Sequence, residues 1–254
     1  MAVKKLVIGN WKMNPETLDE AKKIFSSLKR QAGKFRKIQT VICPPFLYLT
    51  TLLAQKKNGL TIGAQDSFWV PSGAYTGEVS ALQLAKEKVG YCIVGHSERR
   101  ELGESDELVN KKLKALIRAG IIPVLCIGEK ERDHDGFYLA RIKDQIRIAL
   151  QGVKVGGLSH LVIAYEPIWA IGKGAKEAIT GEKLHQMSIY IRKVLSDLYN
   201  KRAAFKTPIL YGGSVDEFNA GEIIKEGQVQ GFLVGRASLD IKSFTKIMEI
   251  VNKQ

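Results

Sequence analysis

The feature that most constrains this chain is an eightfold alternation of short apolar runs with segments of helical spacing. Each run is nearly continuous in Val, Ile, Leu or small residues, which is typical of parallel strands buried on both faces. An alternation of this kind indicates repeated strand–helix units. The apolar runs cover residues 6–11, 40–45, 61–66, 91–97, 121–129, 160–167, 207–215 and 231–239.

The segments between the runs carry their apolar residues on one helical face. In the first of them that face holds Leu18, Ala21, Ile24, Phe25 and Leu28. Eight strand–helix units favour a closed barrel over an open doubly wound sheet. No run is followed by the GxGxxG fingerprint of dinucleotide-binding sheets, which supports the same choice. The sequence therefore predicts an α/β protein with a single (β/α)8 barrel domain over residues 1–254.

Composition narrows the class of protein further. Hydrophobic residues make up 45% and charged residues 26%, which excludes disordered and coiled-coil chains. Cys43, Cys92 and Cys126 lie in apolar stretches and form no CxxC pair, so we expect reduced thiols and no metal site. The N-terminus lacks the pattern of a signal peptide, and no run is long enough to cross a membrane. We expect a cytoplasmic protein.

The chain is strongly basic, because 39 Lys and Arg against 26 Asp and Glu leave a formal charge of +13. Such a charge suits nucleic acid, a membrane surface or an anionic substrate, and it says nothing about the fold. The lysines fall mainly on the predicted amphipathic helices. The favoured interpretation is therefore that the lysines lie on solvated helix faces and that the protein has no nucleic-acid and no membrane partner. Part of the positive electrostatic field can still steer an anionic substrate.

Active sites of barrels form where strands end and loops begin, at the C-terminal face. In three of the predicted strands, alternate residues are mostly apolar and the series ends in an ionisable residue at this face. We call each such series of alternate residues a row. Leu6 and Ile8 lead through Asn10 to Lys12. The other two rows, Cys92–Val94 and Val162–Ala164, lead to His96 and Glu166.

Each of these groups alone is weak evidence for a site. A single glutamate after a strand is more often a solvated loop carboxylate, and a single lysine more often belongs to the surface. Together, a cation, an imidazole and a carboxylate suffice for proton transfer beside an anion. Their joint placement therefore predicts that the three rows converge above the barrel.

Two further features point to a phosphate and a lid. Gly212, Gly213, Ser214 and Gly235 follow the last two strands, where barrels commonly bind phosphate and where backbone N–H groups can approach an anion. The alternative is that these glycines only make tight turns. An apolar segment, residues 167–174, follows Glu166 directly and suits a loop that closes over a ligand.

Seven motifs together resemble the triosephosphate isomerase family. In order along the chain, they are GNWKMN at 9–14, GAYTGE at 73–78, VGHSERR at 94–100, PVLCIGE at 123–129, AYEPIWAIG at 164–172, LYGGSV at 210–215 and GFLVG at 231–235. The resemblance implies interconversion of dihydroxyacetone phosphate and D-glyceraldehyde 3-phosphate through an enediolate. It also implies that the reaction needs no cofactor and no metal.

The resemblance also implies a role for each matching residue. Glu166 is the base, and neutral His96 polarises the carbonyl and relays protons. Lys12, anchored by Glu98, stabilises the developing negative charge. Tyr211 and Ser214 hold the closed lid, and a homodimer brings Thr76 to the neighbouring site. The residues implied to contact substrate are Asn10, Trp11, Lys12, Gly172, Ser214, Gly235 and Arg236.

The chain departs from the family at two places. The family usually has two glycines where this chain has Gly235 and Arg236, and the segment after Gly172 differs from the common lid hinge. In one explanation the Arg236 backbone still binds phosphate while its side chain points away. That explanation requires a negative φ at Arg236. In the other, the guanidinium itself contacts the phosphate.

Two alternative functions remain at this point. Another phosphate-binding barrel enzyme would keep the glycine loops but lack the combination of NWK, GHSERR and YEPIWAIG. A non-catalytic basic binding protein on the same barrel is disfavoured, because Lys12, His96 and Glu166 are all retained.

Overall fold

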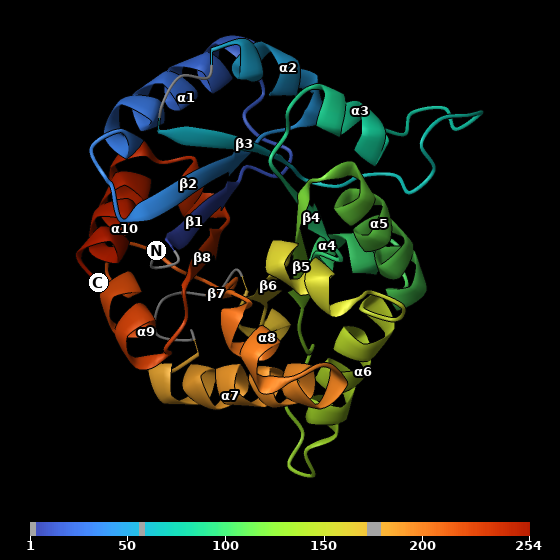
Figure 1. Ribbon diagram of the computed structural model, residues 1–254. Helices are drawn as coiled ribbons and strands as arrows, with labels where there is room; N and C mark the ends of the chain where they lie inside the picture. Colours follow the sequence, from blue (N-terminus) through green and yellow to red (C-terminus); the bar gives the residue numbers. More distant parts are fainter. Residues whose placement is uncertain (1–3, 56–58, 172–178) are drawn as a thin grey trace.

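The computed structural model describes residues 4–55, 59–171 and 179–254, and its centre is a closed barrel of eight parallel strands in sequential order. Figure 1 views the barrel nearly end-on, with the helices in a ring around it. The predicted barrel is thus confirmed. The strands are β1 (Lys5–Asn10), β2 (Ile38–Cys43), β3 (Leu60–Ala64), β4 (Tyr91–Val94), β5 (Ile122–Ile127), β6 (Val162–Tyr165), β7 (Ile209–Tyr211) and β8 (Gly231–Val234).

Helices connect and cover the strands. The α-helices in the described ranges are α1 (Leu18–Ala32), α2 (Phe46–Ala54), α3 (Ala81–Lys86), α4 (Ser97–Glu101), α5 (Asp106–Ala119), α6 (Phe137–Ala149), α7 (Gly181–Leu198), α8 (Lys201–Lys206), α9 (Ala220–Glu226) and α10 (Ile241–Lys253). Short 3-10 turns are η1 (Val155–His160), η2 (Ile168–Ala170) and η4 (Arg236–Ser238). The apolar face predicted for the first helix is buried in α1, where Phe25 and Leu28 have no exposed surface.

Two hydrophobic layers stabilise the barrel. The larger one lies between the strands and the helices. The smaller one fills the barrel interior with Leu6, Ile8, Val41, Cys43, Tyr91, Ile93, Val124, Cys126, Val162, Ala164, Leu210 and Leu233. Because these side chains fill the interior, the barrel is a packed core, and a ligand site is expected above the C-terminal ends of the strands.

The side chains in the barrel interior differ from the prediction for one of the three rows, the one that leads to His96. Tyr91 and Ile93 face the inside of the barrel, whereas Cys92 and Val94 belong to the outer layer. The prediction that His96 continues an inward row is therefore wrong. The strand ends at Val94, and Gly95 follows with a φ of 68°, which interrupts the alternation before His96.

Candidate active site

A cavity of about 600 Å³ opens above the C-terminal ends of the strands. The loops after β1, β4, β6, β7 and β8 all contribute to it. Of the residues predicted for the site, the lining includes Asn10, Trp11, Lys12, His96, Glu166, Ser214, Gly235 and Arg236. Side chains from three distant parts of the chain thus meet in one place, as their positions at strand ends predicted.

Lys12 lies directly after β1 in a constrained backbone conformation. Its φ is 53°, a region that residues other than glycine rarely adopt and that costs on the order of 1–2 kcal/mol. Two contacts hold it there: Lys12 N donates to Asn10 Oδ1 at 3.1 Å, and Gln65 Nε2 donates to Lys12 O at 2.8 Å. Gln65 also donates to Cys43 O, so it fixes Lys12 against β2.

The ammonium of Lys12 pairs with Glu98. Nζ lies 2.5 Å from Glu98 Oε1, and the side chains are 32% and 52% exposed. The pair is open to solvent, so its contribution to stability is modest. Its main consequence is geometric, because Glu98 directs the ammonium toward the cavity rather than outward from the rim.

His96 is held by the start of α4. The peptide N–H of Glu98 donates to His96 Nδ1 at 3.2 Å, so Nδ1 carries a lone pair and the imidazole proton belongs on Nε2. The backbone of the preceding residue is held at both of its peptide groups: Gly95 N donates to Glu104 Oε2, and Arg100 Nε donates to Gly95 O. The ring is therefore presented as a neutral donor with a defined orientation.

Glu166 is almost completely buried, with 2% of its surface exposed. Its Oε2 accepts a hydrogen bond from Ser97 N at 3.1 Å. Its Oε1 lies 3.3 Å from His96 Nε2 and accepts no hydrogen bond from any described residue. One carboxylate oxygen is thus anchored, and the other is free to accept a proton.

The position of Glu166 depends on close backbone neighbours. A Cβ on Gly128 would lie 1.8 Å from Glu166 O, and a Cβ on Gly212 would lie 2.9 Å from Glu166 Cγ. Both distances are shorter than real Cβ contacts. Two loops can approach the glutamate this closely only because they carry glycine there.

The loops after β7 and β8 form the other side of the cavity. Gly212, Gly213 and Ser214 come from the first loop, and Gly235 and Arg236 from the second. Ser214 Oγ donates to Ala170 O at 2.9 Å, which ties the loop after β7 to the segment after Glu166. The hydroxyl of Tyr211 lies deep in the protein, and burial raises its pKa.

Arg236 begins the 3-10 turn η4 with a φ outside the positive range. Its side chain is exposed, and no ion pair joins it to the carboxylates of the described residues. The backbone condition of the first explanation is met. Gly235 and Arg236 thus both line the cavity, and the side chain of Arg236 is accessible to solvent.

Sequence reasoning assigned no role to two residues of this region. One is Gln65, described above. The other is Glu129, at the end of the PVLCIGE motif, which is 2% exposed and accepts from Tyr165 Oη, Trp169 Nε1 and Arg132 Nε. Glu129 therefore fixes the turn that follows Glu166. A carboxylate directly after a buried strand was the only signal in the sequence.

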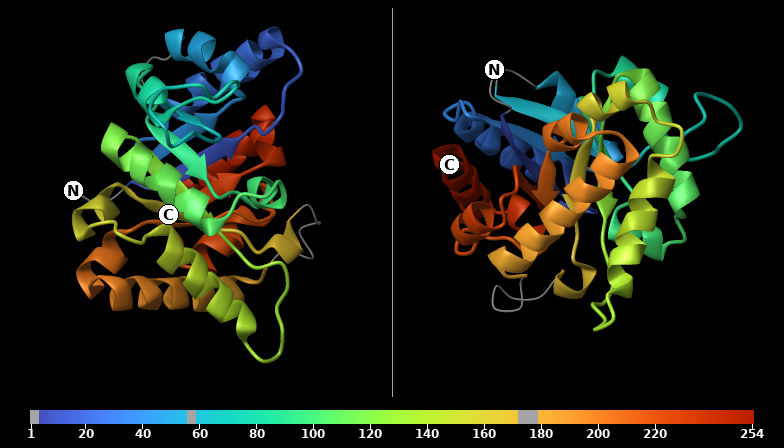
Figure 2. Two further views of the ribbon diagram at one scale, coloured as in Figure 1. Left: turned by 90° about the vertical axis from the view of Figure 1, so that its right-hand side faces the viewer. Right: turned by 60° about the horizontal axis from the view of Figure 1, so that its bottom comes forward.

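Some predicted site residues are inaccessible in the cavity or lie outside it. Trp11 borders the cavity but has no exposed surface, so it has no direct contact with a ligand in this conformation. Gly172, and with it the C-terminal lid hinge, lies outside the described residues. Thr76 sits in an exposed loop, residues 71–78, that extends away from the barrel (Figures 1 and 2).

The ranges that the structure describes contain neither a candidate metal site nor a candidate membrane span. They contain no group of three or more His, Cys, Asp or Glu side chains arranged to hold a metal ion. No helix within them has both the length and the apolar character needed to cross a bilayer.

Comparison with known proteins gives one consistent match. The family model described as triosephosphate isomerase matches residues 5–251. A protein of Dehalococcoides mccartyi named triosephosphate isomerase is 44% identical over 245 residues, covering 95% of this chain and 94% of its own. A relative of the same name from Mycoplasma pneumoniae is 42% identical over 247 residues, which cover 97% of this chain and 98% of the relative. Another from Natranaerobius thermophilus is 39% identical over 250 residues, which cover 98% of this chain and 96% of the relative.

Proposed function

The chain belongs to the triosephosphate isomerase family, and from this premise we propose how its own residues carry out the reaction. The enzyme interconverts dihydroxyacetone phosphate and D-glyceraldehyde 3-phosphate by moving a proton between neighbouring carbons. A carbon next to a carbonyl is a weak acid. Its deprotonation therefore needs both a placed base and stabilisation of the enediolate oxygen as charge develops.

Glu166 is the proposed base. Oε2 is anchored by Ser97 N, so the carboxylate cannot rotate freely, and Oε1 has no hydrogen-bond donor within the described residues. Glu166 itself lines the cavity. An anchored carboxylate with one free oxygen meets the geometric requirement for taking a proton from one carbon and returning it to the next.

His96 and Lys12 are the proposed partners of the base. His96 Nε2 carries the proton and points into the cavity beside Glu166 Oε1, so it can donate to a substrate oxygen. A neutral imidazole matches an enediol better than an imidazolium does. Lys12 adds a fixed positive charge for the enediolate and the phosphate, and Asn10 holds its backbone in place.

The loops after β7 and β8 are the proposed phosphate site. Backbone N–H groups of Gly213, Ser214 and Gly235 can approach an anion closely. Because the Ser214 hydroxyl also binds Ala170 O, phosphate binding there is coupled to the segment that follows Glu166. We also propose that Gly172 contributes a backbone contact once the loop closes, which excludes water from the intermediate.

The observation that supports this mechanism is that Lys12, His96 and Glu166 line the same cavity, with His96 Nε2 only 3.3 Å from Glu166 Oε1. The test is a coupled assay with glyceraldehyde 3-phosphate on the purified enzyme, repeated after dialysis against EDTA. We expect the same turnover in both preparations. Loss of activity that returns on adding a divalent cation would contradict the cofactor-free mechanism.

The phosphate site gives a prediction about Arg236. Because its side chain is exposed and unpaired among the described residues, Arg236→Gly should leave KM for glyceraldehyde 3-phosphate within about threefold, or roughly 0.7 kcal/mol. Initial-rate kinetics at low and high salt measure the effect. A rise in KM of tenfold or more that shrinks as salt is added would show that the guanidinium contacts the phosphate.

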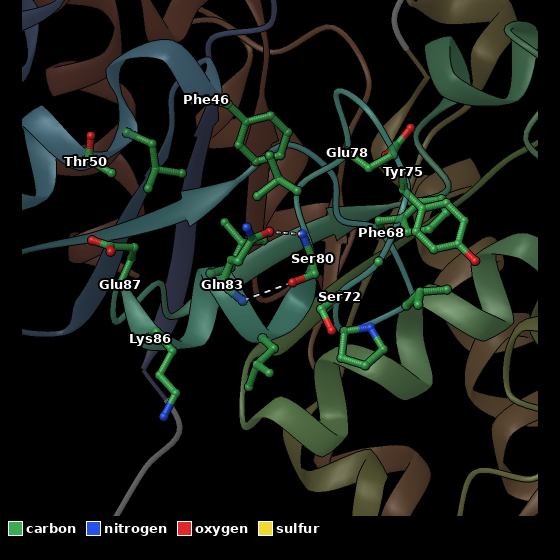
Figure 3. A pocket seen from close by; sticks show the side chains of 17 residues that line it. Phe46, Thr50, Phe68, Ser72, Tyr75, Glu78, Ser80, Gln83, Lys86 and Glu87 are labelled. Atoms are coloured by element: carbon green, nitrogen blue, oxygen red, sulfur yellow. Dashed lines mark hydrogen bonds between the residues drawn. The ribbon is translucent and has the colours of Figure 1, made fainter.

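We also propose that the enzyme is a homodimer built on the loop of residues 71–78. All eight of these residues are exposed. At the base of the loop is a cavity of about 810 Å³, in which Phe46, Phe68 and Tyr75 present apolar surface (Figure 3). Three further apolar side chains are strongly exposed: Leu47 at the start of α2 by 80%, and Met13 and Leu102 in connections by 93% and 79%. Exposed apolar surface on this scale typically marks an interface, and a second copy of this chain would cover it.

The proposed dimer would place Thr76 beside the neighbour's Lys12 and His96. Light scattering after size exclusion should give at least twice 28.2 kDa. Leu47→Glu should lower the mass toward the monomer and reduce activity, because a buried unpaired charge opposes association. Phe137→Glu, at a side chain 72% exposed on α6, is the matched control. A fully active monomer at assay concentration would contradict the proposal.

A cytoplasmic location is part of the same proposal. Cys43, Cys92 and Cys126 are free and buried, and burial raises the pKa of each thiol. Free, unreactive thiols are typical of proteins in a reducing compartment such as the cytoplasm.

A further inference from the structure

A group of lysines and arginines lies at the end of the barrel opposite the active site. In a closed parallel barrel every connection that leads into a strand lies at the N-terminal end. Segments 33–37 and 199–208 lead into β2 and β7, and neither contains Asp or Glu. We call the basic face the set Lys4, Lys5, Lys34, Arg36, Lys37, Lys201, Arg202 and Lys206.

The basic face lies on one half of the barrel end. Its residues precede β1, β2 and β7, and the order β7–β8–β1–β2 makes these strands neighbours. The connection into β8 lies between the two groups and carries the uncharged residues Gln228 and Gln230. The cations therefore form two clusters on either side of a polar, uncharged segment.

Local structure does not account for these charges. No member of the basic face forms an ion pair with a carboxylate of the described residues, whereas nearby Lys253 pairs with Glu249. Burial, and then the charge of Lys37, lowers the pKa of Lys5, so two members repel each other. Lys201 and Arg202 occupy the first turn of α8, where the helix dipole disfavours a cation.

A cavity of about 590 Å³ adjoins one cluster, between α7, α8 and the connection into β8. Arg192, Lys193 and Lys201 bring positive charge to its wall, and Phe205 is 61% exposed there. Arg192 is fixed in place, since Nη1 donates to Ala204 O and Nη2 donates to Gln230 Oε1. Its guanidinium lies 5.4 Å from the centre of the Phe205 ring, so it supports that ring from one side.

We propose that the basic face and this cavity bind single-stranded nucleic acid. Proteins that bind single strands combine a positive track for the phosphates with aromatic side chains on which bases stack. Here the two clusters would follow the backbone, and the exposed ring of Phe205 would stack on a base. Gln228, which has a side-chain amide, lines the same cavity.

A nucleic-acid site here differs from the expectation drawn from the sequence, which placed the lysines on solvated helix faces with no nucleic-acid partner. The linear sequence separates residues 4–5, 33–37 and 199–208, and the barrel topology makes them neighbours. A recessed cavity beside an exposed aromatic ring suits a splayed base better than a flat lipid surface. Because the active site opens at the other end, nucleic acid and triose phosphate can be bound together.

The test is fluorescence anisotropy of a labelled single-stranded oligonucleotide of about 20 nucleotides, titrated with the full-length enzyme from about 50 to 200 mM salt. We compare the double variant Lys201→Gln/Arg202→Gln with the control Lys23→Gln/Lys143→Gln. The control removes the same charge from exposed, unpaired positions of α1 and α6.

The basic-face variant should bind at least about tenfold more weakly, with a salt slope reduced by roughly 1.4, which is two contacts at 0.7 each. Phe205→Ala should weaken binding at least about fivefold with little change in slope. The control should bind like the parent, and kcat/KM for isomerisation should stay within about twofold in all four proteins. The melting temperature of the basic-face variant should not fall, because its cations oppose the dipole of α8.

Three results would overturn the proposal. The first is no saturable binding of the oligonucleotide by the parent at the lowest salt. The second is an equal loss in the control pair, which would show a diffuse charge effect. The third is binding of the parent to vesicles that contain anionic lipid, without binding to the oligonucleotide.

Discussion

Glu166→Asp should lower kcat by on the order of 10²-fold and leave KM nearly unchanged. The substitution retracts the carboxylate by one methylene, about 1 Å or more from the substrate carbon. The shorter side chain cannot both keep the hydrogen bond from Ser97 N and bring its other oxygen to the position of Oε1. Substrate binding is affected little, because the phosphate site and Lys12 are untouched. Steady-state kinetics in both directions measure the change.

The control for this variant is Glu107→Asp, at a fully exposed carboxylate in the first turn of α5. It should have parental kinetics. Thermal unfolding of both variants separates misplacement of the base from a loss of folded protein, since Glu166→Asp leaves the buried Ser97 N–H less well satisfied. A Glu166→Asp enzyme within about twofold of the parental kcat, with an intact fold, would remove Glu166 from the mechanism.

The barrel was predictable from the sequence because its strands are buried on both faces. Burial on both sides makes each strand a nearly continuous apolar run, and α1 shows the complementary one-sided pattern with Phe25 and Leu28 on its buried face. Gly120 follows α5 with a φ of 77°, the left-handed conformation that glycine typically adopts after the last residue of a helix. These features depend on local sequence alone.

The placement of His96 was not predictable by the same reasoning. Alternation along a strand holds only while the chain stays extended, and β4 ends at Val94. Gly95 then turns the chain, and contacts from Glu104 and Arg100 hold its peptide. These partners belong to the following loop and helix, so the pattern of β4 contains no information about them. His96 reaches the site through this turn rather than through the predicted row.

Gln65 and Glu129 show a second limit of sequence reasoning. Both act on residues of other strands: Gln65 fixes the backbone of Lys12, and Glu129 holds the turn around Trp169. Their type and position, a polar residue directly after a buried strand, match those of catalytic candidates. Only the contacts show that they position other groups and do not face the cavity themselves.

Lys12→Met should lower kcat/KM by on the order of 10³-fold without a comparable loss of stability. The ammonium is the positive charge fixed at the rim of the cavity between the base, the imidazole and the phosphate loops. Its side chain lies close to the loop after β8, since a Cβ on Gly235 would lie 3.5 Å from Lys12 Cε. Methionine keeps most of the side-chain volume but leaves the enediolate and the phosphate without this cation. It also leaves Glu98 unpaired beside an anionic substrate, which adds repulsion.

Two further variants separate the charge of Lys12 from its backbone conformation. Lys12→Gly relieves the positive φ of 53° but also removes the charge, so it should be as inactive as Lys12→Met. Glu98→Gln keeps a side chain that can accept a hydrogen bond from Lys12 Nζ, so it should lose far less activity than either. Initial rates and thermal unfolding of the three variants test this order. If Lys12→Met kept more than about a tenth of the parental kcat/KM, stabilisation of the developing charge would have to come from His96 and backbone N–H groups alone.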